Sequence, residues 1–118
     1  PLFPSKINPI DGSVILVEGS IDALNLINGG LYNATAVLGA TNMSKEKIEG
    51  LRFLGVRKLY IMFDGDNAGK EAAKKLEEEW ESTFLVERLE LPDGLDPGDL
   101  SIEDIKQIKD NLYESSSN

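Results

Sequence analysis

Short apolar runs alternate with amphipathic stretches along this chain, a pattern that predicts strands alternating with helices. The runs that we expect to form strands cover residues 14–17, 34–38, 58–63 and 84–91. The first run, Val14-Ile15-Leu16-Val17, has no polar interruption and is bounded on both sides by glycine and serine. An uninterrupted β-branched and aliphatic run of this kind is typical of a strand that is buried on both faces.

Helices are expected between and after these strands, at residues 21–28, 44–54, 67–80 and 101–112. Ser20 and Ser44 are the expected N-caps of the first two helices. The third helix has the strongest pattern, because its apolar residues from Ala68 to Trp80 fall on one face. Ser101, with Asp104 three residues later, predicts a capping box at the start of the last helix.

The resulting order is a strand followed by a helix, four times over. This order predicts an α/β domain with a parallel sheet and helices on both faces. We expect the first strand to lie between the second and the third, so that a crevice opens where the strand order reverses.

Composition and charge limit the chemistry. The 118 residues suit one domain and contain no cysteine and no histidine, which excludes disulfides, the usual zinc sites and histidine catalysis. With 12 basic and 21 acidic residues the net charge is −9, so the chain alone is a poor binder of nucleic acid phosphates. No run approaches the roughly 20 apolar residues of a membrane span, and no signal peptide is visible; we expect a cytoplasmic setting.

Acidic residues follow three of the predicted strands. They are Glu18 and Asp22, then Asp64 and Asp66, then Asp93, Asp96 and Asp99. Because the carboxyl ends of parallel strands share one edge of the sheet, several of these acids are expected to meet there. Two carboxylates about 4 Å apart repel by roughly 4 kcal/mol at an effective dielectric of 20, so one would take up a proton unless a cation offsets the repulsion. Oxygen ligands alone favour Mg²⁺ or Mn²⁺.

Structural interpretations of the same acids stay open at this point. Asp66 precedes a helix and is equally well explained as its N-cap. Asp22 suits the first turn of a helix, where the helix dipole favours a negative charge. Asp93 lies in a Pro-Asp-Gly sequence that is typical of a turn.

Residues that could contact a phosphate lie beside these acids. Gly19 and Gly65 flank the acids and permit close approach of a ligand to the backbone. The helix from Asn67 directs its N-terminus at the same edge, which favours anions, and Lys70 lies in its first turn. Lysines on helices are more often simply solvated.

Four segments, in order, resemble the Toprim family. Residues 17–23 (VEGSIDA) are similar to its first motif, and residues 63–69 (FDGDNAG) to its DxD motif. Residues 36–41 (AVLGAT) are similar to the glycine-containing segment after its second strand. Residues 91–100 (LPDGLDPGDL) resemble a segment of the bacterial DnaG-type and phage primases, which often reads Asp-Pro-Asp where this chain has Gly98 after Pro97.

The resemblance implies a compact Rossmann-like fold with four parallel strands and metal-dependent phosphoryl transfer. It implies that Glu18 acts as a general acid or base, or helps to position the metal. By the same resemblance the metal ligands are Asp64 and Asp66, with Asp22, Asp96 and Asp99 as further candidates. Whether Asp99 replaces the acid missing at position 98 is left open.

The function that follows is that of a DNA primase, a nucleotidyltransferase that makes RNA primers during DNA replication. Single-stranded DNA and nucleoside triphosphates are the expected partners, bound through a larger parent protein with a zinc-binding or helicase domain and no membrane contact. Two alternatives remain. One is a Toprim nuclease or a topoisomerase-type enzyme that cleaves DNA, and the other is a non-catalytic Toprim module of a repair or recombination protein.

The sequence is expected to divide into three parts. Residues 1–12 are an N-terminal extension, residues 13–112 the Toprim domain, and residues 113–118 a disordered tail.

Overall fold

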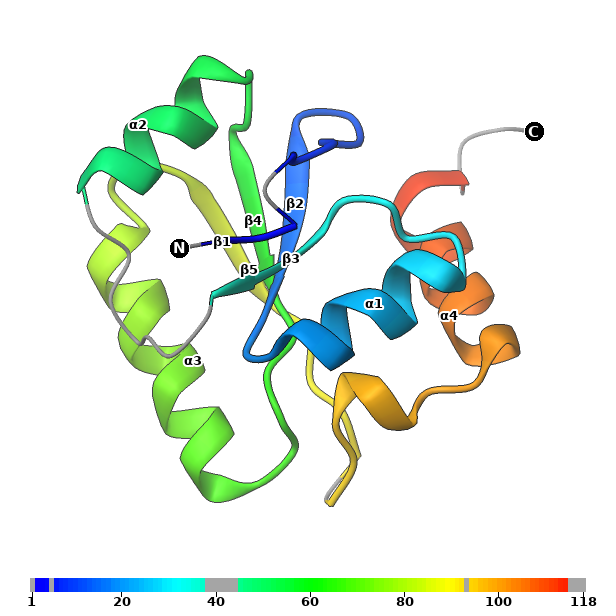
Figure 1. Cartoon of the computed structure of the whole chain (residues 1–118). Helices are drawn as coiled ribbons and strands as arrows, with labels where there is room; N and C mark the ends of the chain where they lie inside the picture. Colours follow the sequence, from blue (N-terminus) through cyan, green and yellow to red (C-terminus); the bar gives the residue numbers. More distant parts are fainter. Residues whose placement is uncertain (1, 5, 38–44, 93, 115–118) are drawn as a thin grey trace.

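The computed structural model describes residues 2–4, 6–37, 45–92 and 94–114 of the chain. One twisted sheet runs through the molecule, with helices packed on both of its faces (Figure 1). The strand order is β1-β3-β2-β4-β5. The α/β architecture expected from the sequence is therefore confirmed.

Four of the five strands are parallel and correspond to the predicted apolar runs. They are β2 (Ser13–Val17), β3 (Ala34–Val37), β4 (Lys58–Ile61) and β5 (Leu85–Arg88). The strand β2 pairs in parallel with β3 on one side and with β4 on the other. The predicted reversal of strand order next to the first strand is thus present, between β2 and β4.

The strand β1 (Leu2–Phe3) was not expected from the sequence. It pairs antiparallel with β3, with Leu2 opposite Val37. The sequence interpretation placed these residues in an extension, because two residues are too short a run to show a strand period. Their pairing depends on β3, more than 30 residues away along the chain.

Four α-helices connect and flank the strands. They are α1 (Ser20–Asn28), α2 (Lys45–Phe53), α3 (Asn67–Trp80) and α4 (Ile102–Lys109). A 3₁₀ turn, η1 (Pro97–Asp99), precedes α4, and a π-helical segment, η2 (Asp110–Glu114), follows it. The third helix has the predicted bounds, and α4 begins with the predicted capping box of Ser101 and Asp104.

The N-cap predicted for α1 is wrong by one residue. Gly19 is the N-cap, and its carbonyl accepts the amide of Ala23, so Ser20 is already inside the helix. The Gly19 backbone is extended, a conformation that fits the end of β2 and needs no capping side chain. Ser44, the predicted cap of α2, lies outside the described residues.

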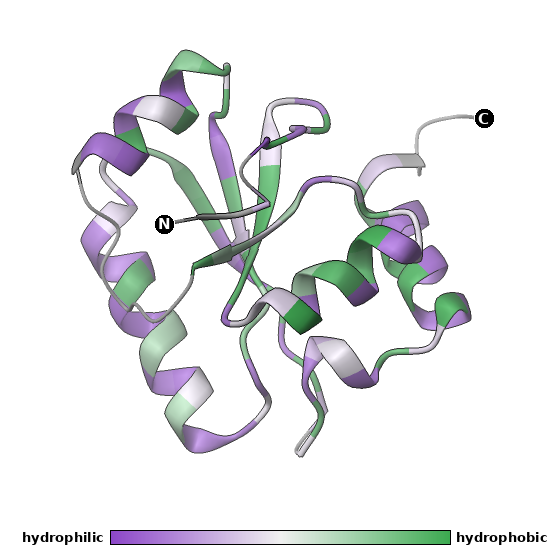
Figure 2. Cartoon of the chain, viewed as in Figure 1, coloured by the Kyte–Doolittle hydropathy of each residue, from purple (hydrophilic) through white to green (hydrophobic). Residues whose placement is uncertain are grey.

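Alternating side chains of the buried strands belong to two separate hydrophobic cores, one on each face of the sheet. Val14 and Leu16 of β2 pack with residues of α2 and α3 on one face of the sheet. Ile15 and Val17 point to the opposite face, where α1 and α4 cover them. Figure 2 shows the hydrophobic colour concentrated on the strands and on α1, with hydrophilic positions along the outside of α3. Both faces of the sheet are covered, as the continuous apolar run of β2 predicted.

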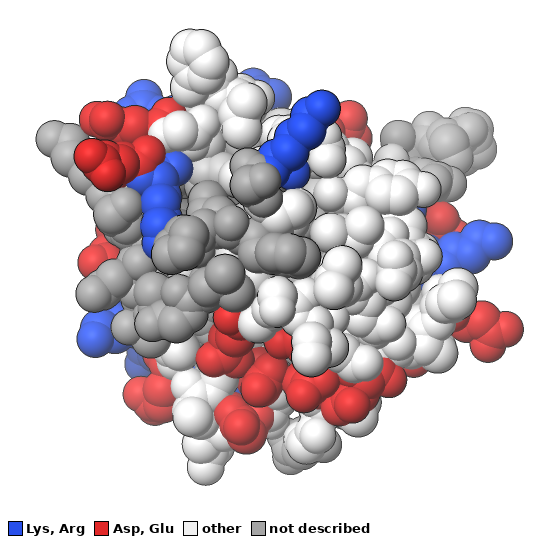
Figure 3. All heavy atoms as spheres, viewed as in Figure 1, with Lys and Arg blue, Asp and Glu red and all other residues white. Residues whose placement is uncertain are grey.

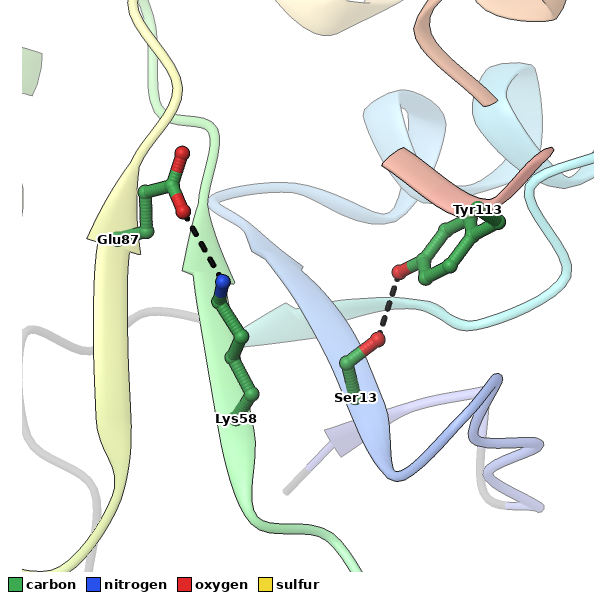
Figure 4. Close-up of polar contacts among 4 residues, drawn as sticks. All are labelled: Ser13, Lys58, Glu87 and Tyr113. Atoms are coloured by element: carbon green, nitrogen blue, oxygen red, sulfur yellow. Dashed lines mark hydrogen bonds and ion pairs between the residues drawn. The ribbon is translucent and has the colours of Figure 1, made fainter. Parts of the chain in front are cut away.

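A polar junction ties the end of the chain to the start of β2. The Tyr113 hydroxyl lies 2.7 Å from Ser13 Oγ (Figure 4). The same hydroxyl accepts a 2.8 Å hydrogen bond from Asn33 Nδ2. The Tyr113 ring also packs edge-on against Tyr60. The sequence interpretation assigned Tyr113 to a tail, but the structure packs it against the sheet.

The strands β4 and β5 are joined at the surface by an ion pair between Lys58 Nζ and Glu87 Oε1, at 3.0 Å (Figure 4).

Within the described segments, no helix is long and apolar enough to cross a membrane.

Candidate metal site

Acidic side chains gather at the carboxyl edge of the sheet. Figure 3 shows them as a band along the lower edge of the molecule, near the start of α1. Three of them, Asp22, Asp64 and Asp96, each place a carboxylate oxygen within 4.8 Å of the other two. They come from α1, from the end of β4 and from the turn before η1, so only the fold brings them together.

Asp64 is placed by the end of β4. The pairing of β4 with β2 ends at Ile61, which lies opposite Leu16 of β2. The Asp64 amide then donates a 3.1 Å hydrogen bond to Glu18 Oε1. Glu18 therefore lies across the predicted crevice from Asp64, as the sequence interpretation expected.

Asp22 and Asp96 are joined through the backbone of η1. Asp22 lies in the first turn of α1, and its Oδ1 accepts a 3.0 Å hydrogen bond from the amide of Gly98. Asp96 occupies the N-cap position of η1, two residues earlier. The contact between α1 and η1 thus sets how closely these two carboxylates approach.

The electrostatics of the three acids are unfavourable without a cation. Burial, and then the charges of Glu18, Asp22 and Asp96, together raise the pKa of Asp64 to about 6. Burial, and then the charge of Asp96, also raises the pKa of Asp22, against the lowering effect of the Gly98 amide. A bound cation would reverse these repulsions, so the site is electrostatically suited to one.

Asp66 and Asp99 have evident structural roles. Asp66 Oδ1 accepts a 2.7 Å hydrogen bond from the amide of Gly69, so Asp66 is the N-cap of α3. Asp99 Oδ2 accepts a 3.1 Å hydrogen bond from the amide of Asp96 and stabilises the η1 turn. The capping interpretation of Asp66 is confirmed, and metal binding by either residue stays a prediction.

Of the two glycines beside the acids, Gly65 is required by packing. A Cβ on Gly65 would lie 2.5 Å from the carbonyl oxygen of Pro92, and the Gly65 amide donates to the carbonyl of Leu95 at 2.8 Å. This close approach places the loop that carries Asp96 against the end of β4. Gly19 caps α1, and phosphate binding by either glycine stays a prediction.

Lys70 lies in the first turn of α3 and lines a small pocket with Asp64, Gly65 and Arg88. The pocket is at the carboxyl edge of the sheet, and of the three acids Asp64 lines it. A role of Lys70 in phosphate binding is compatible with this position and is not tested by it.

Two expectations about the surroundings of the site fall outside the described residues: the segment around Gly39 and the turn residue Asp93. One residue near the site had no sequence signal at all. Asn25 lies on α1 and donates hydrogen bonds to the segment that carries Asp96.

Comparisons with known proteins identify the family of this chain. The family model described as Toprim-like matches residues 15–101. The chain is 38% identical over 85 residues to a DNA primase of Chlamydia pneumoniae, a match that covers 71% of this chain and 14% of the relative. The chain therefore spans about a seventh of that relative's length.

Solved structures give the same result. The zinc-binding and RNA polymerase domains of the Aquifex aeolicus primase match with a TM-score of 0.69 and 32% identity, over 89% of this chain and 26% of that one. A DnaG primase catalytic domain bound to single-stranded DNA matches with a TM-score of 0.68 and 29% identity. This match covers 88% of this chain and 33% of that one. This chain belongs to the Toprim-like family and is homologous to part of the catalytic region of DNA primases.

Proposed function

We propose that this chain is the catalytic Toprim domain of a DNA primase and that it binds a divalent ion, Mg²⁺ or Mn²⁺, between Asp22, Asp64 and Asp96. Toprim domains bind divalent metal, and primer synthesis is the reaction of the homologous primases. The observation that carries the proposal is the meeting of three carboxylates at the carboxyl edge of the sheet.

The donor set fits such an ion. All three candidate ligands are carboxylate oxygens within 4.8 Å of one another. Oxygens around an octahedral Mg²⁺ lie at about 2.1 Å from the ion, and hence about 3 to 4 Å from one another. A small closing movement of the three side chains would bring them to these distances, and waters or substrate oxygens would complete the shell.

The surrounding residues have separable roles in this proposal. A bound divalent ion would supply the positive charge that lowers the pKa of an attacking hydroxyl and offsets charge on the transferred phosphoryl group. Glu18 holds the Asp64 backbone through one oxygen and keeps the other for a proton or a water. Asp66 fixes the start of α3, which presents Lys70 and the helix N-terminus toward an incoming phosphate.

The template must be held elsewhere in a longer polypeptide. A net charge of −9 opposes binding of single-stranded DNA by this domain alone. The matched Aquifex structure includes a zinc-binding domain, and the other matched primase is bound to single-stranded DNA. We extend both features to the parent protein of this chain, with nucleoside triphosphates as co-substrates and the cytoplasm as location.

The first test is calorimetric titration of the chain with MnCl₂ and MgCl₂. Wild type should bind, and Asp64→Asn should lose most of the binding. Glu79→Gln on the exposed side of α3 removes the same charge far from the site and should bind like wild type. Equal, negligible binding by wild type and Asp64→Asn would refute the metal site.

The second test separates primer synthesis from DNA cleavage. The parent protein is incubated with single-stranded DNA and Mn²⁺, with and without ribonucleotides. Ribonucleotide-dependent extension that Asp64→Asn abolishes supports a primase, whereas cleavage without ribonucleotides indicates a nuclease. Robust priming by these 118 residues alone would contradict the proposed need for a separate template-binding region.

A further inference from the structure

One side chain of α1 holds both ends of the η1 turn. Asn25 Nδ2 donates a 2.9 Å hydrogen bond to the carbonyl of Pro97 and another, also of 2.9 Å, to the carbonyl of Leu100. A side-chain amide carries two hydrogens, so its entire donor capacity is used on this turn. The two acceptors bracket the turn, because Pro97 begins it and Leu100 follows its last residue.

This contact lies beside the candidate metal ligands. Asn25 follows Asp22 by three residues, which places both side chains on the same face of α1. Asp22 accepts the amide of Gly98, in the middle of the same turn. The segment carrying Asp96 is therefore attached to α1 at three points, of which two come from Asn25.

Gly98 lets the turn approach this closely. A Cβ at this position would lie 3.0 Å from Asp22 Oδ1 and 3.2 Å from Asp96 Oδ1. The glycine that departs from the primase pattern thus lies between two candidate ligands, and its amide donates to Asp22. The three hydrogen bonds that attach the turn to α1 therefore all have neutral donors, namely the Gly98 amide and the Asn25 side chain.

We propose that Asn25 is a positioning residue that holds Asp96 within reach of Asp22 and Asp64 before the metal binds. The inference rests on the proposed metal site and adds a residue to it. Three carboxylates repel one another when no cation is present, and this repulsion tends to drive the loop with Asp96 away. The two neutral hydrogen bonds from Asn25 resist that movement without adding a charge. The loop with Asp96 therefore loses less conformational freedom when the ion binds.

The choice of asparagine has a chemical reason. Aspartate at this position could not donate to either carbonyl and would add another negative charge to the site. Lysine could donate but would compete electrostatically with the metal for the same carboxylates. Only a short, neutral side chain with two donor hydrogens meets both requirements here.

The test compares Asn25→Ala with Asn28→Ala, which removes an exposed asparagine from the same helix. Titration with MnCl₂ should show a dissociation constant about tenfold higher for Asn25→Ala, comparable to the loss of one or two hydrogen bonds. Asn28→Ala should bind like wild type. Thermal unfolding of both variants shows whether the fold is intact.

A second measurement does not depend on metal. Hydrogen–deuterium exchange of the peptide covering residues 95–101, in metal-free protein, should be faster in Asn25→Ala than in wild type and unchanged in Asn28→Ala. A purely structural role of Asn25 would lower the unfolding temperature without a selective change in this peptide.

The outcomes separate the inference from the proposed function. If wild type binds Mn²⁺ and folded Asn25→Ala binds it equally well, Asn25 does not position the site, while the metal site stands. If wild type binds no metal, the proposed function fails and this inference fails with it. Should Asn25→Ala not fold, Asn25→Ser goes through the same measurements, and failure of both to fold would overturn a positioning role.

Discussion

Replacing Asp64 with asparagine should stabilise the metal-free protein, although it removes a candidate metal ligand. In the folded chain the pKa of Asp64 is raised from 3.8 to about 6, first by burial and then by the neighbouring acids. A carboxyl whose folded pKa lies above its unfolded value contributes stability at low pH, and loses it as pH rises through the folded pKa. Asparagine never ionises, so Asp64→Asn escapes this loss.

The magnitude follows from the size of the shift. About two pKa units at 1.36 kcal/mol each give an upper bound of roughly 3 kcal/mol. Asp64 is only half-buried, and solvent screening reduces the expected gain to about 1 kcal/mol. For a chain of this length, such a gain raises the unfolding temperature by about 4 °C.

The assay is thermal unfolding in EDTA at pH 7.5 and at pH 4, followed by circular dichroism. The unfolding temperature of Asp64→Asn should exceed that of wild type by the full amount at pH 7.5. This difference should decrease as the pH is lowered past 6 and should be small near pH 4. Addition of Mn²⁺ should reverse the order, since a ligand at 100 times its dissociation constant adds about 2.7 kcal/mol to wild type only.

Glu79→Gln is the control for net charge, and it should shift the unfolding temperature little at either pH. The reasoning is refuted if Asp64→Asn is no more stable than wild type at pH 7.5 in EDTA. That result would mean that burial and the neighbouring acids do not disfavour the charged form of Asp64 in the folded chain.

Three further predictions concern the elements that build the site, and each is measured by urea unfolding in EDTA. Asp66→Ala should lose about 1 kcal/mol because α3 loses its N-cap, whereas Asp66→Ser keeps a cap; an equal loss in both would argue against capping. Gly65→Ala should cost about 1–3 kcal/mol because its Cβ meets the Pro92 carbonyl, while Gly50→Ala, with open space around it in α2, should be stabilising. Tyr113→Phe should cost about 1–2 kcal/mol by removing the partner of Ser13 and Asn33, and Tyr32→Phe, whose ring is exposed, should be neutral. Unchanged stability of Gly65→Ala or Tyr113→Phe would contradict the packing described here.

Local patterns were sufficient for the elements whose determinants are close together in the sequence. The bounds of α3 follow from one capping aspartate and an apolar stripe within 15 residues. The capping box of α4 and the parallel strands β2 to β5 follow in the same way from residues that are near neighbours. The order of the strands was also predictable, because the connections are short and of one hand.

Errors occurred where a distant part of the chain decides the local structure. Two residues form β1 only because β3 offers them an edge. Tyr113 belongs to the folded part because Ser13 and Asn33 provide partners for its hydroxyl. The cap of α1 is a local exception: the extended backbone after β2 continues through Gly19, and the Gly19 carbonyl accepts the Ala23 amide, so Ser20 is already inside the helix.

The sequence by itself determined the fold class, the edge of the sheet on which the acids lie, and the pairing of Glu18 with the end of β4. It could not choose among the six candidate acids, because their roles depend on which oxygens meet in space. The tertiary structure decided that Asp22, Asp64 and Asp96 converge and that Asn25 and Gly98 hold the Asp96 turn against α1. It also showed that Asp66 caps α3 and that Asp99 stabilises the η1 turn. The physical reason is that hydrophobic periodicity is set by neighbouring residues along the chain, whereas carboxylates separated by 74 residues meet only after the loop that carries one of them has folded back.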